Sequence, residues 1–295
     1  MSTDREAPAP AARVLWDSRG LRVVDYRCQA QPGDRPFAEQ HVRHSVSLVR
    51  RGSFGCRCGS RSHALVPGAL LVGRTGDEYT CTHDHHAGGD ACLSFQLEPH
   101  AVEEFVGADP AWRTGMAAGD AQLAVLGSLA CAAADGSSTL GLDEAAILFL
   151  DRFARRGEER PRDLPLSPHA ERRLVDAALW LAAHSREPVD LGRAAAQAGF
   201  SSFHFLRLFA RRFGLTPHQY LIRRRLADAA SLLCGRGELS VTEIAFEVGF
   251  GDLSNFVRTF QKAAAVPPSR FRKLAGAERD RLRAQVAQRA HPLPV

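Results

Sequence analysis

Cysteine and histidine residues recur at close spacing in the first third of the chain, where they could bind a metal ion or carry out thiol chemistry. Cys56 and Cys58 are two residues apart, as are Cys81 and His83, so on extended strands each pair would share one face. Thiolate and imidazole ligands suit zinc or copper. The alternative is that the cysteines are small buried residues and that the histidine is hydrated on a polar turn. These four residues are the candidates for a metal or redox sensor, and no metal or other cofactor is assigned.

Two further kinds of chemistry would use the same residue types. Metal-dependent cupin enzymes place clustered histidines and a carboxylate inside a barrel, and His83, Asp84, His85 and His86 superficially fit this arrangement. The glycine and glutamate framework expected around such residues is missing. A suicide methyltransferase needs four closely spaced cysteines, whereas the cysteines of the first hundred residues are scattered. We therefore expect that the chain is not an enzyme.

Charge is distributed unevenly along the chain. Residues 168–276 contain sixteen Arg or Lys against nine Asp or Glu, a net charge of +7, which leaves −2 on the remainder of a chain whose total is +5. A basic segment attached to a mildly acidic one suits a polyanionic partner for the basic segment only.

The compartment is predicted from what the chain lacks. Its N-terminus has no signal-peptide core, and no apolar run approaches the roughly 20 residues that cross a bilayer. Seven cysteines are an odd number for a disulfide framework. We expect a cytoplasmic protein with reduced thiols and no membrane partner.

An internal repeat occupies the basic segment and is the most specific pattern in the chain. Both copies carry a Gly-Phe pair followed by spaced aromatic residues, a proline and a final aromatic residue. Three aromatic pairs repeat at an interval of 51 residues: Phe205 and Phe256, Phe209 and Phe260, Tyr220 and Phe271.

Each copy is predicted to form two helices around a glycine turn. In the first copy, small residues between Ala194 and Ala198 form a short helix that Gly199 ends, and Ser201 or Ser202 caps the next helix. In the second copy, Gly249 and an Asp252 cap take these places. Short helix, glycine turn and capped amphipathic helix make up a helix-turn-helix unit.

A single long helix is predicted between the two units, over residues 217–233. Pro217 lies in its first turn, and Tyr220, Leu221, Leu226, Ala229 and Leu233 face inward. Its length of about 25 Å would let both units reach successive major grooves on one face of DNA. Arg223, Arg224 and Arg225 point largely outward in this prediction, so they could contact phosphate or simply face water.

These residues resemble the C-terminal DNA-binding domain of the AraC/XylS family of transcription regulators. The resemblance covers roughly residues 167–274, including IAFEVGF at 244–250, FVRTFQK at 256–262 and Pro267-Pro268. One departure is Ala265, which stands where the family often has Asp or Gly, so we expect a slightly altered turn. The family's N-terminal domain, a cupin-like barrel followed by helices for dimerisation, is matched only in layout and in the Pro67-Gly68 turn.

The resemblance and the helix phase together imply which residues contact DNA. Exposed positions on a recognition helix touch base edges, and apolar positions hold the fold. Phe203 would either read a thymine methyl group or be tucked inward. The implied DNA-contacting residues are Ser202, Phe203, Leu206 and Arg207 in the first unit and Ser254, Asn255 and Arg258 in the second, with Arg223, Arg224, Arg225 and Lys262 as candidate phosphate contacts. Each could instead lie on a solvated helix face.

The first half of the chain shows short strands and then helices. Turn signals between residues 14 and 98 separate runs that suggest an antiparallel barrel or sandwich. The predicted strands are 45–50, 53–58, 69–73, 79–83 and 91–97, and the predicted helices are 101–106, 120–134 and 142–156. In the last helix, Ala145, Leu148, Phe149 and Arg152 form a stripe that would pack under the strands or against a second copy.

The predicted architecture is α+β, with an N-terminal cupin-like antiparallel β-barrel and following helices, then an all-α domain of two helix-turn-helix units joined by a long helix. Its divisions are a disordered lead (1–12), an effector-binding and dimerisation domain (13–157), a linker (158–166), the DNA-binding domain (167–276) and a tail (277–295). The resemblance implies double-stranded DNA and an unknown small-molecule effector as partners. It also implies a homodimer, and RNA polymerase could be a further partner.

Overall fold

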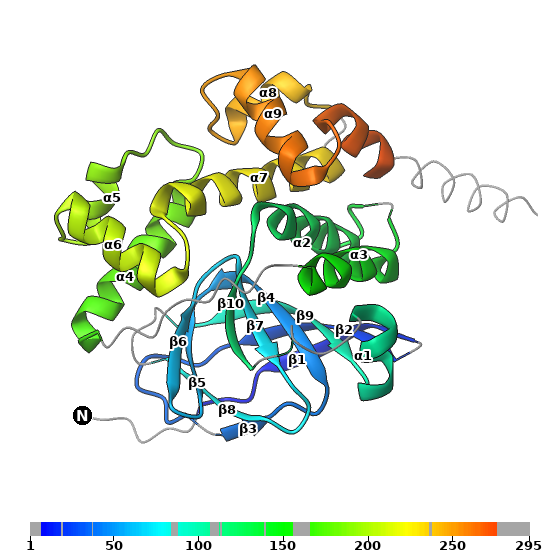
Figure 1. The fold of residues 1–295 in the computed structure, drawn as a ribbon, viewed down its shortest axis with the longest axis vertical. Coiled ribbons are helices and arrows are strands. Elements are labelled where there is room, and N and C mark those ends of the chain that lie inside the picture. Colours follow the sequence, from blue (N-terminus) through cyan, green and yellow to red (C-terminus); the bar gives the residue numbers. More distant parts are fainter. Residues whose placement is uncertain are drawn as a thin grey trace, which may run out of the picture.

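The computed structural model describes residues 7–18, 20–36, 38–83, 88–106, 112, 114–138, 140–155, 166–235 and 238–275. Strands occupy one end of the molecule, and helices α4 to α9 extend across the other end (Figure 1). Helices α2 and α3 lie between the strands and the C-terminal helices in this view. Among the helices of the described residues, none has the length and hydrophobicity that a membrane-spanning helix needs.

The described strands form two antiparallel sheets, of six and four strands. Their orders are β1-β2-β9-β4-β7-β10 and β3-β8-β5-β6. The strands are β1 (Ala11–Ser18), β2 (Leu21–Cys28), β3 (Ala38–Gln40), β4 (His44–Gly52), β5 (Phe54–Cys58), β6 (Arg61–Leu65), β7 (Ala69–Gly73), β8 (Glu78–Thr82), β9 (Asp90–Leu97) and β10 (Gly115–Ala118). The five predicted strands are confirmed as β4, β5, β7, β8 and β9, whereas the other five strands were not predicted.

An apolar core joins the two sheets. Phe54 and Leu65 of the smaller sheet pack with Leu71, Cys92 and Met116 of the larger one. The mixed α and β architecture with antiparallel sheets is therefore confirmed, and within the described residues the strands are arranged as two facing sheets.

Three helices cover the outer face of the larger sheet: α1 (Pro99–Val106), α2 (Ala121–Ala134) and α3 (Leu142–Ala154). Ala145 and Phe149 of α3 are fully buried there, and the Phe149 ring stacks on Phe95 with centroids 4.6 Å apart. A side chain at Gly127 of α2 would overlap Leu48, so the glycine lets this helix approach the sheet closely. Ala145 and Phe149 of the predicted stripe thus pack against the sheet, whereas Leu148 is 43% exposed and Arg152 pairs with Asp120 at the start of α2.

The chain is ordered closer to its N-terminus than the sequence predicted. Strand β1 begins at Ala11, and the Ala7 amide donates a hydrogen bond to the Arg35 carbonyl at 3.0 Å. Residues 7–12 therefore belong to the fold, because β1 pairs with β2 along its length. Residues 1–6, the predicted tail and the predicted linker apart from Leu166 lie outside the described residues.

The C-terminal part contains the predicted repeat. Its helices are α4 (Pro168–Ala183), α5 (Leu191–Gln197), α6 (Ser202–Phe213), α7 (Pro217–Gly235), α8 (Val241–Glu247) and α9 (Leu253–Ala264). Gly199 and Gly249 have φ of +62° and +92°, so each ends its short helix in the left-handed region as predicted. Helix α4 was not predicted.

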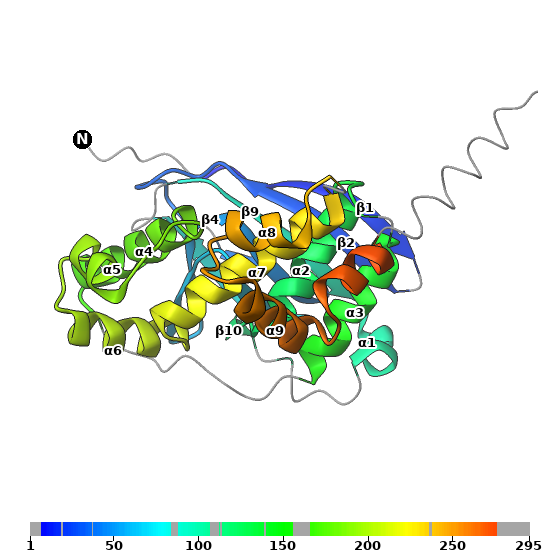
Figure 2. The same ribbon diagram turned by 90° about the horizontal axis from the view of Figure 1, so that it is seen from above.

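The N-terminal helix α2 completes the core of the second unit. Its side chains Val125 and Leu129 share one apolar cluster with Leu226 of α7 and with Phe256 and Phe260 of α9. Seen from above, α7 runs across the molecule close to α2 (Figure 2). The two parts of the chain are thus packed together, a contact that the predicted division into two domains at a linker (158–166) did not include.

Candidate nucleic-acid interface

Helix α6 presents a polar and partly apolar face to solvent. Its N-cap is Ser201, whose Oγ accepts a hydrogen bond from the His204 amide at 3.4 Å. Ser202 and Arg207 are exposed, Leu206 is half-buried, and Phe203 is 73% exposed. Phe203 therefore does not tuck inward, and the predicted DNA-contacting residues of this unit share the outer surface of one helix.

Helix α9 presents the corresponding face of the second unit. Asp252 caps it by accepting a hydrogen bond from the Asn255 amide at 2.7 Å. Ser254 and Arg258 are exposed, whereas Asn255 is half-buried. The Asn255 Oδ1 accepts hydrogen bonds from Arg258 at 3.5 Å and from Thr259 at 3.3 Å, which hold these side chains together.

Sequence reasoning missed one residue of this face. Gln261 is exposed and lines a shallow groove with Ser254, Arg258 and Lys262. Its separation of seven residues from Ser254 is two helical turns, and that spacing could have identified it.

Helices α6 and α9 lie on the same side of α7, toward its two ends, with α5 and α8 behind them (Figures 1 and 2). Helix α7 has 19 residues. At 1.5 Å per residue it spans about 28 Å. This length is close to one turn of DNA, about 34 Å. A connecting helix of this length is compatible with the predicted placement of the two units in successive major grooves.

Comparison with known proteins agrees with this geometry. A family model described as a helix-turn-helix domain matches residues 194–274. The probable transcription factor PqrA of Proteus vulgaris is 31% identical over 106 residues, which are 35% of this chain and 86% of that protein. The chain belongs to the AraC/XylS family of transcription regulators.

Other relatives align over different lengths. The transcriptional activator RhrA of Rhizobium meliloti (strain 1021) is 45% identical over 73 residues, which cover 24% of this chain and only 23% of RhrA. The HTH-type transcriptional activator RhaS of Salmonella paratyphi B (strain ATCC BAA-1250 / SPB7) is 26% identical over 241 residues, 77% of this chain and 84% of RhaS. This AraC/XylS chain thus spans about a quarter of the length of RhrA.

The residue that ends each of the two exposed helices, α6 and α9, differs between the two units of this AraC/XylS chain. Gly214 ends α6 with φ of +75°, and Ala265 ends α9 with φ of +59°. Ala265 is the non-glycine residue with positive φ in the described part of the chain. The turn is therefore the same in both units, and the predicted alteration of the turn is wrong. Ala265 instead adopts a left-handed backbone conformation, which is unfavourable for a residue that has a Cβ atom.

The three consecutive arginines of α7 make contacts within the molecule. Arg223 donates to the Gly119 carbonyl of the N-terminal part, and Arg224 pairs with Asp228 at 3.5 Å. Arg225 donates from Nε to the Ser185 carbonyl at 2.6 Å and from Nη2 to the Glu187 carbonyl at 2.7 Å. All three are half-buried, not largely outward as predicted, because α7 is covered by α2 on one side and by the segment after α4 on another.

Lys262 differs from these arginines. It is exposed at the last turn of α9, on the groove that Arg258 also lines. Of the four candidate phosphate contacts in this AraC/XylS chain, Lys262 is the residue that lies on the exposed face of α9 beside Arg258.

Three of the predicted sensor residues lie together on the smaller sheet. The Cys56 and Cys58 sulfurs are 3.5 Å apart, and Cys56 pairs directly with Cys81 on the neighbouring strand. The hydrogen bond between Cys56 and Cys58 raises the pKa of Cys56, with Cys81 and burial adding to it, and lowers the pKa of Cys58.

The fourth predicted sensor residue, His83, lies elsewhere, in contact with two residues that the sequence did not single out. Its Nε2 is 3.7 Å from the Cys28 sulfur and 3.5 Å from the Asp90 Oδ2. Burial lowers the pKa of His83, but its contacts with Asp90 and Cys28 outweigh this effect and raise the pKa to about 10. Cys28 and Asp90 pair across β2 and β9. Asp84, His85 and His86 lie outside the described residues.

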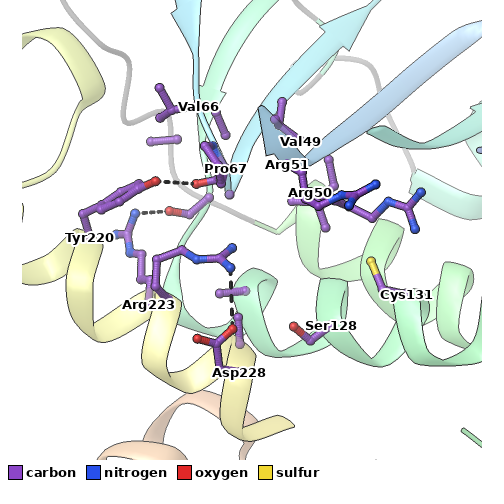
Figure 3. A pocket seen from close by; sticks show the side chains of 18 of the residues that line it. Val49, Arg50, Arg51, Val66, Pro67, Ser128, Cys131, Tyr220, Arg223 and Asp228 are labelled. Carbon is purple, nitrogen blue, oxygen red and sulfur yellow. Dashed lines mark hydrogen bonds and ion pairs between the residues drawn. The ribbon is translucent and has the colours of Figure 1, made fainter. Parts of the chain in front are cut away.

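Two cavities could hold small molecules. One, of about 190 Å³, lies within the N-terminal part, and polar residues including Tyr26, Glu39 and Gln96 line it. The other, of about 380 Å³, lies between α2, α7 and the ends of β4 and β7. Figure 3 shows Arg50, Arg51, Arg223 and Asp228 around the second cavity, with Tyr220 hydrogen bonded to the Pro67 carbonyl at 3.0 Å.

Proposed function

We propose that this chain is a sequence-specific regulator of transcription whose helices α6 and α9 enter successive major grooves of double-stranded DNA. The observation that carries the proposal is the pair of exposed helix faces on one side of α7 (Figure 2). Membership of the AraC/XylS family supports the same function. DNA is the polyanion that suits the basic C-terminal segment.

Individual side chains on these faces suit different DNA groups. Arg207 and Arg258 can form paired hydrogen bonds with a guanine edge, and Phe203 can pack on a thymine methyl group. Ser202, Leu206, Ser254 and Asn255 lie beside them as further base contacts. Lys262 is proposed as a phosphate contact, whereas Arg223, Arg224 and Arg225 are left out because the protein itself already engages them.

Binding measurements on the full chain test this proposal. Genomic fragments that bind the purified protein are selected, and affinity is then measured at several salt concentrations for the wild type, Arg207→Ala and Arg258→Ala. Each variant should lose about 1 to 3 kcal/mol of binding free energy on its selected site. Arg155→Ala is the matched control, because Arg155 is exposed on the N-terminal part and pairs with Asp151. An equal loss in the control, or no specific fragment at all, would overturn the proposal.

Control by a small molecule bound in a cupin-like N-terminal domain is the second part of the proposed function. The polar-lined cavity between the sheets supports it, since such a cavity can hold a ligand with several hydrogen-bonding groups. A route to the DNA-binding helices also exists, because α2 packs on α7 and on the core of α9. Ligands identified by thermal stabilisation of the full chain should change its affinity for DNA, and stabilisation without any such change would contradict this part.

A homodimer and a contact with RNA polymerase remain predictions from the family resemblance. Leu148 and Ile147 of α3, which are 43% and 42% exposed, are the surface that a second copy would cover.

A further inference from the structure

Cys28, His83 and Asp90 bring three different metal-binding groups to one point of the N-terminal part. The thiol, imidazole and carboxylate donor atoms all lie within 4.8 Å of one another. The His83 and Asp90 side chains are only 4% and 8% exposed, respectively. Burying a carboxylate and an imidazole side by side costs free energy unless their charges are compensated and their polar atoms have bonding partners.

Hydrogen bonding alone accounts poorly for this arrangement. The distance of 3.5 Å from His83 Nε2 to Asp90 Oδ2 exceeds the usual range for such a bond. The Cys28 sulfur approaches the same nitrogen, at 3.7 Å. A single ring nitrogen carries at most one proton and cannot serve both partners well. In a nucleophilic Cys-His-Asp triad the two partners would instead use the two different ring nitrogens.

Two of the three donor separations match the edges of a tetrahedron around a metal ion, and the third, from the Cys28 sulfur to the Asp90 carboxylate, is within 4.8 Å. With zinc bond lengths of about 2.3 Å to sulfur and about 2.0 to 2.2 Å to nitrogen and oxygen, tetrahedral angles separate sulfur from nitrogen by roughly 3.6 Å and nitrogen from oxygen by roughly 3.4 Å. The observed separations are 3.7 Å and 3.5 Å. We propose that Cys28, His83 and Asp90 bind one zinc-like divalent ion, with the fourth position open to the cavity between the sheets.

The chemistry of the donors selects the class of ion. One thiolate, one imidazole and one carboxylate favour zinc over magnesium or calcium, which prefer oxygen ligands alone. All three residues also line the cavity of about 190 Å³, so water or a donor atom of a bound molecule can take the fourth position. Three protein ligands with one open position are typical of zinc that meets a small molecule.

The three ligands come from both sheets of the N-terminal part. Cys28 ends β2 and Asp90 begins β9 in the larger sheet, whereas His83 directly follows β8 of the smaller sheet. An ion held by all three would join the two sheets at one end of the cavity. This site is separate from helices α6 and α9, so metal binding can be tested independently of DNA binding.

Cobalt titration of the full chain, freed of metal with a chelator and carrying no histidine tag, tests the site. The wild type should bind one equivalent of Co²⁺ with the visible absorption of a tetrahedral ion and a thiolate charge-transfer band, and Zn²⁺ should displace it. Because loss of an outer-shell partner costs about 10- to 100-fold in affinity, Cys28→Ser and His83→Gln should each weaken binding by more than roughly 100-fold. Asp90→Asn keeps the size of the side chain and should also weaken binding.

Cys58→Ser is the matched control, because Cys58 lies on the same sheet as β8 but outside the three ligands. It should bind Co²⁺ like the wild type. Far-ultraviolet circular dichroism and cooperative thermal unfolding of each metal-free variant establish that it is folded. Absence of stoichiometric Co²⁺ binding in the folded wild type, or loss of binding in Cys58→Ser with retention in Cys28→Ser, would overturn the proposal.

Discussion

Ala265 and Gly214 occupy equivalent turns in the two units, so exchanging their residue types makes a reciprocal test of backbone strain. A left-handed conformation costs a non-glycine residue about 1 to 2 kcal/mol, and glycine escapes this cost. Ala265→Gly should therefore raise the free energy of unfolding by up to about 1 kcal/mol, since glycine also gains entropy in the unfolded chain. Gly214→Ala should lower it by about 1 kcal/mol. Urea unfolding followed by circular dichroism measures both, and a destabilised Ala265→Gly variant would show that the turn is not strained.

His41 provides a test of pH dependence at the scale of one residue. Burial lowers its pKa to about 4, with Asp77 opposing the effect, and its ring stacks on Tyr79 at a centroid distance of 4.2 Å. In the unfolded chain the pKa is about 6.5, so below that pH the unfolded state gains a proton that the folded state does not. Stability is therefore lost as pH falls from 6.5 toward 4, by roughly 2 kcal/mol between pH 7 and pH 5.

His41→Gln removes this titration. Urea unfolding of the variant at pH 7 and at pH 5 should show a smaller loss of stability on acidification than the wild type shows, whatever the variant's stability at pH 7. An equal loss in both proteins would contradict a neutral buried His41.

At the scale of elements, α2 belongs to two parts of the molecule. Its Leu123 faces the larger sheet, whereas Leu129, 7% exposed, lies in the cluster with α7 and α9. Leu129→Ala should lower the free energy of unfolding by about 2 kcal/mol or more, as for other buried leucines. Leu274→Ala is the matched control, because Leu274 is 57% exposed and its truncation should cost well under about 1 kcal/mol. Equal costs for the two substitutions would mean that α2 is not docked on α7.

The elements also show what the sequence could predict. Gly199, Gly249, and the phenylalanines at intervals of 51 residues identify both helix-turn-helix units, because local turn chemistry and periodicity determine them. Strand β2 has apolar residues at consecutive positions, since Val23 and Val24 are buried on opposite faces of the sheet, and so it shows no clean alternation.

Contacts between segments that are distant in the chain could not be predicted from the sequence. The pairing of Cys28 with Asp90 depends on the register of β2 and β9, and the approach of His83 depends on how the two sheets face each other. Likewise, the contact of Arg223 with the Gly119 carbonyl depends on how the N-terminal part packs on α7. The sequence of α7 itself does not indicate this packing.

At the scale of the whole molecule, the central claim is that one chain reads two different DNA segments from one side. The exposed faces of α6 and α9 differ, with Phe203 and Leu206 in one and Ser254 and Asn255 in the other, so the site of one chain should not be a palindrome. The segments should lie about 10 bp apart, centre to centre, on the same face of the duplex.

Footprinting of wild type, Arg207→Ala and Arg258→Ala on a selected site tests this claim most directly. The wild type should protect two segments on one face, and each variant should lose protection and base preference in one segment only, a different one for each variant. Uniform weakening that lowers the salt slope by about one would instead identify a phosphate contact at that arginine. Protection that is symmetric within the site of one chain, or two segments on opposite faces of the DNA, would contradict the account.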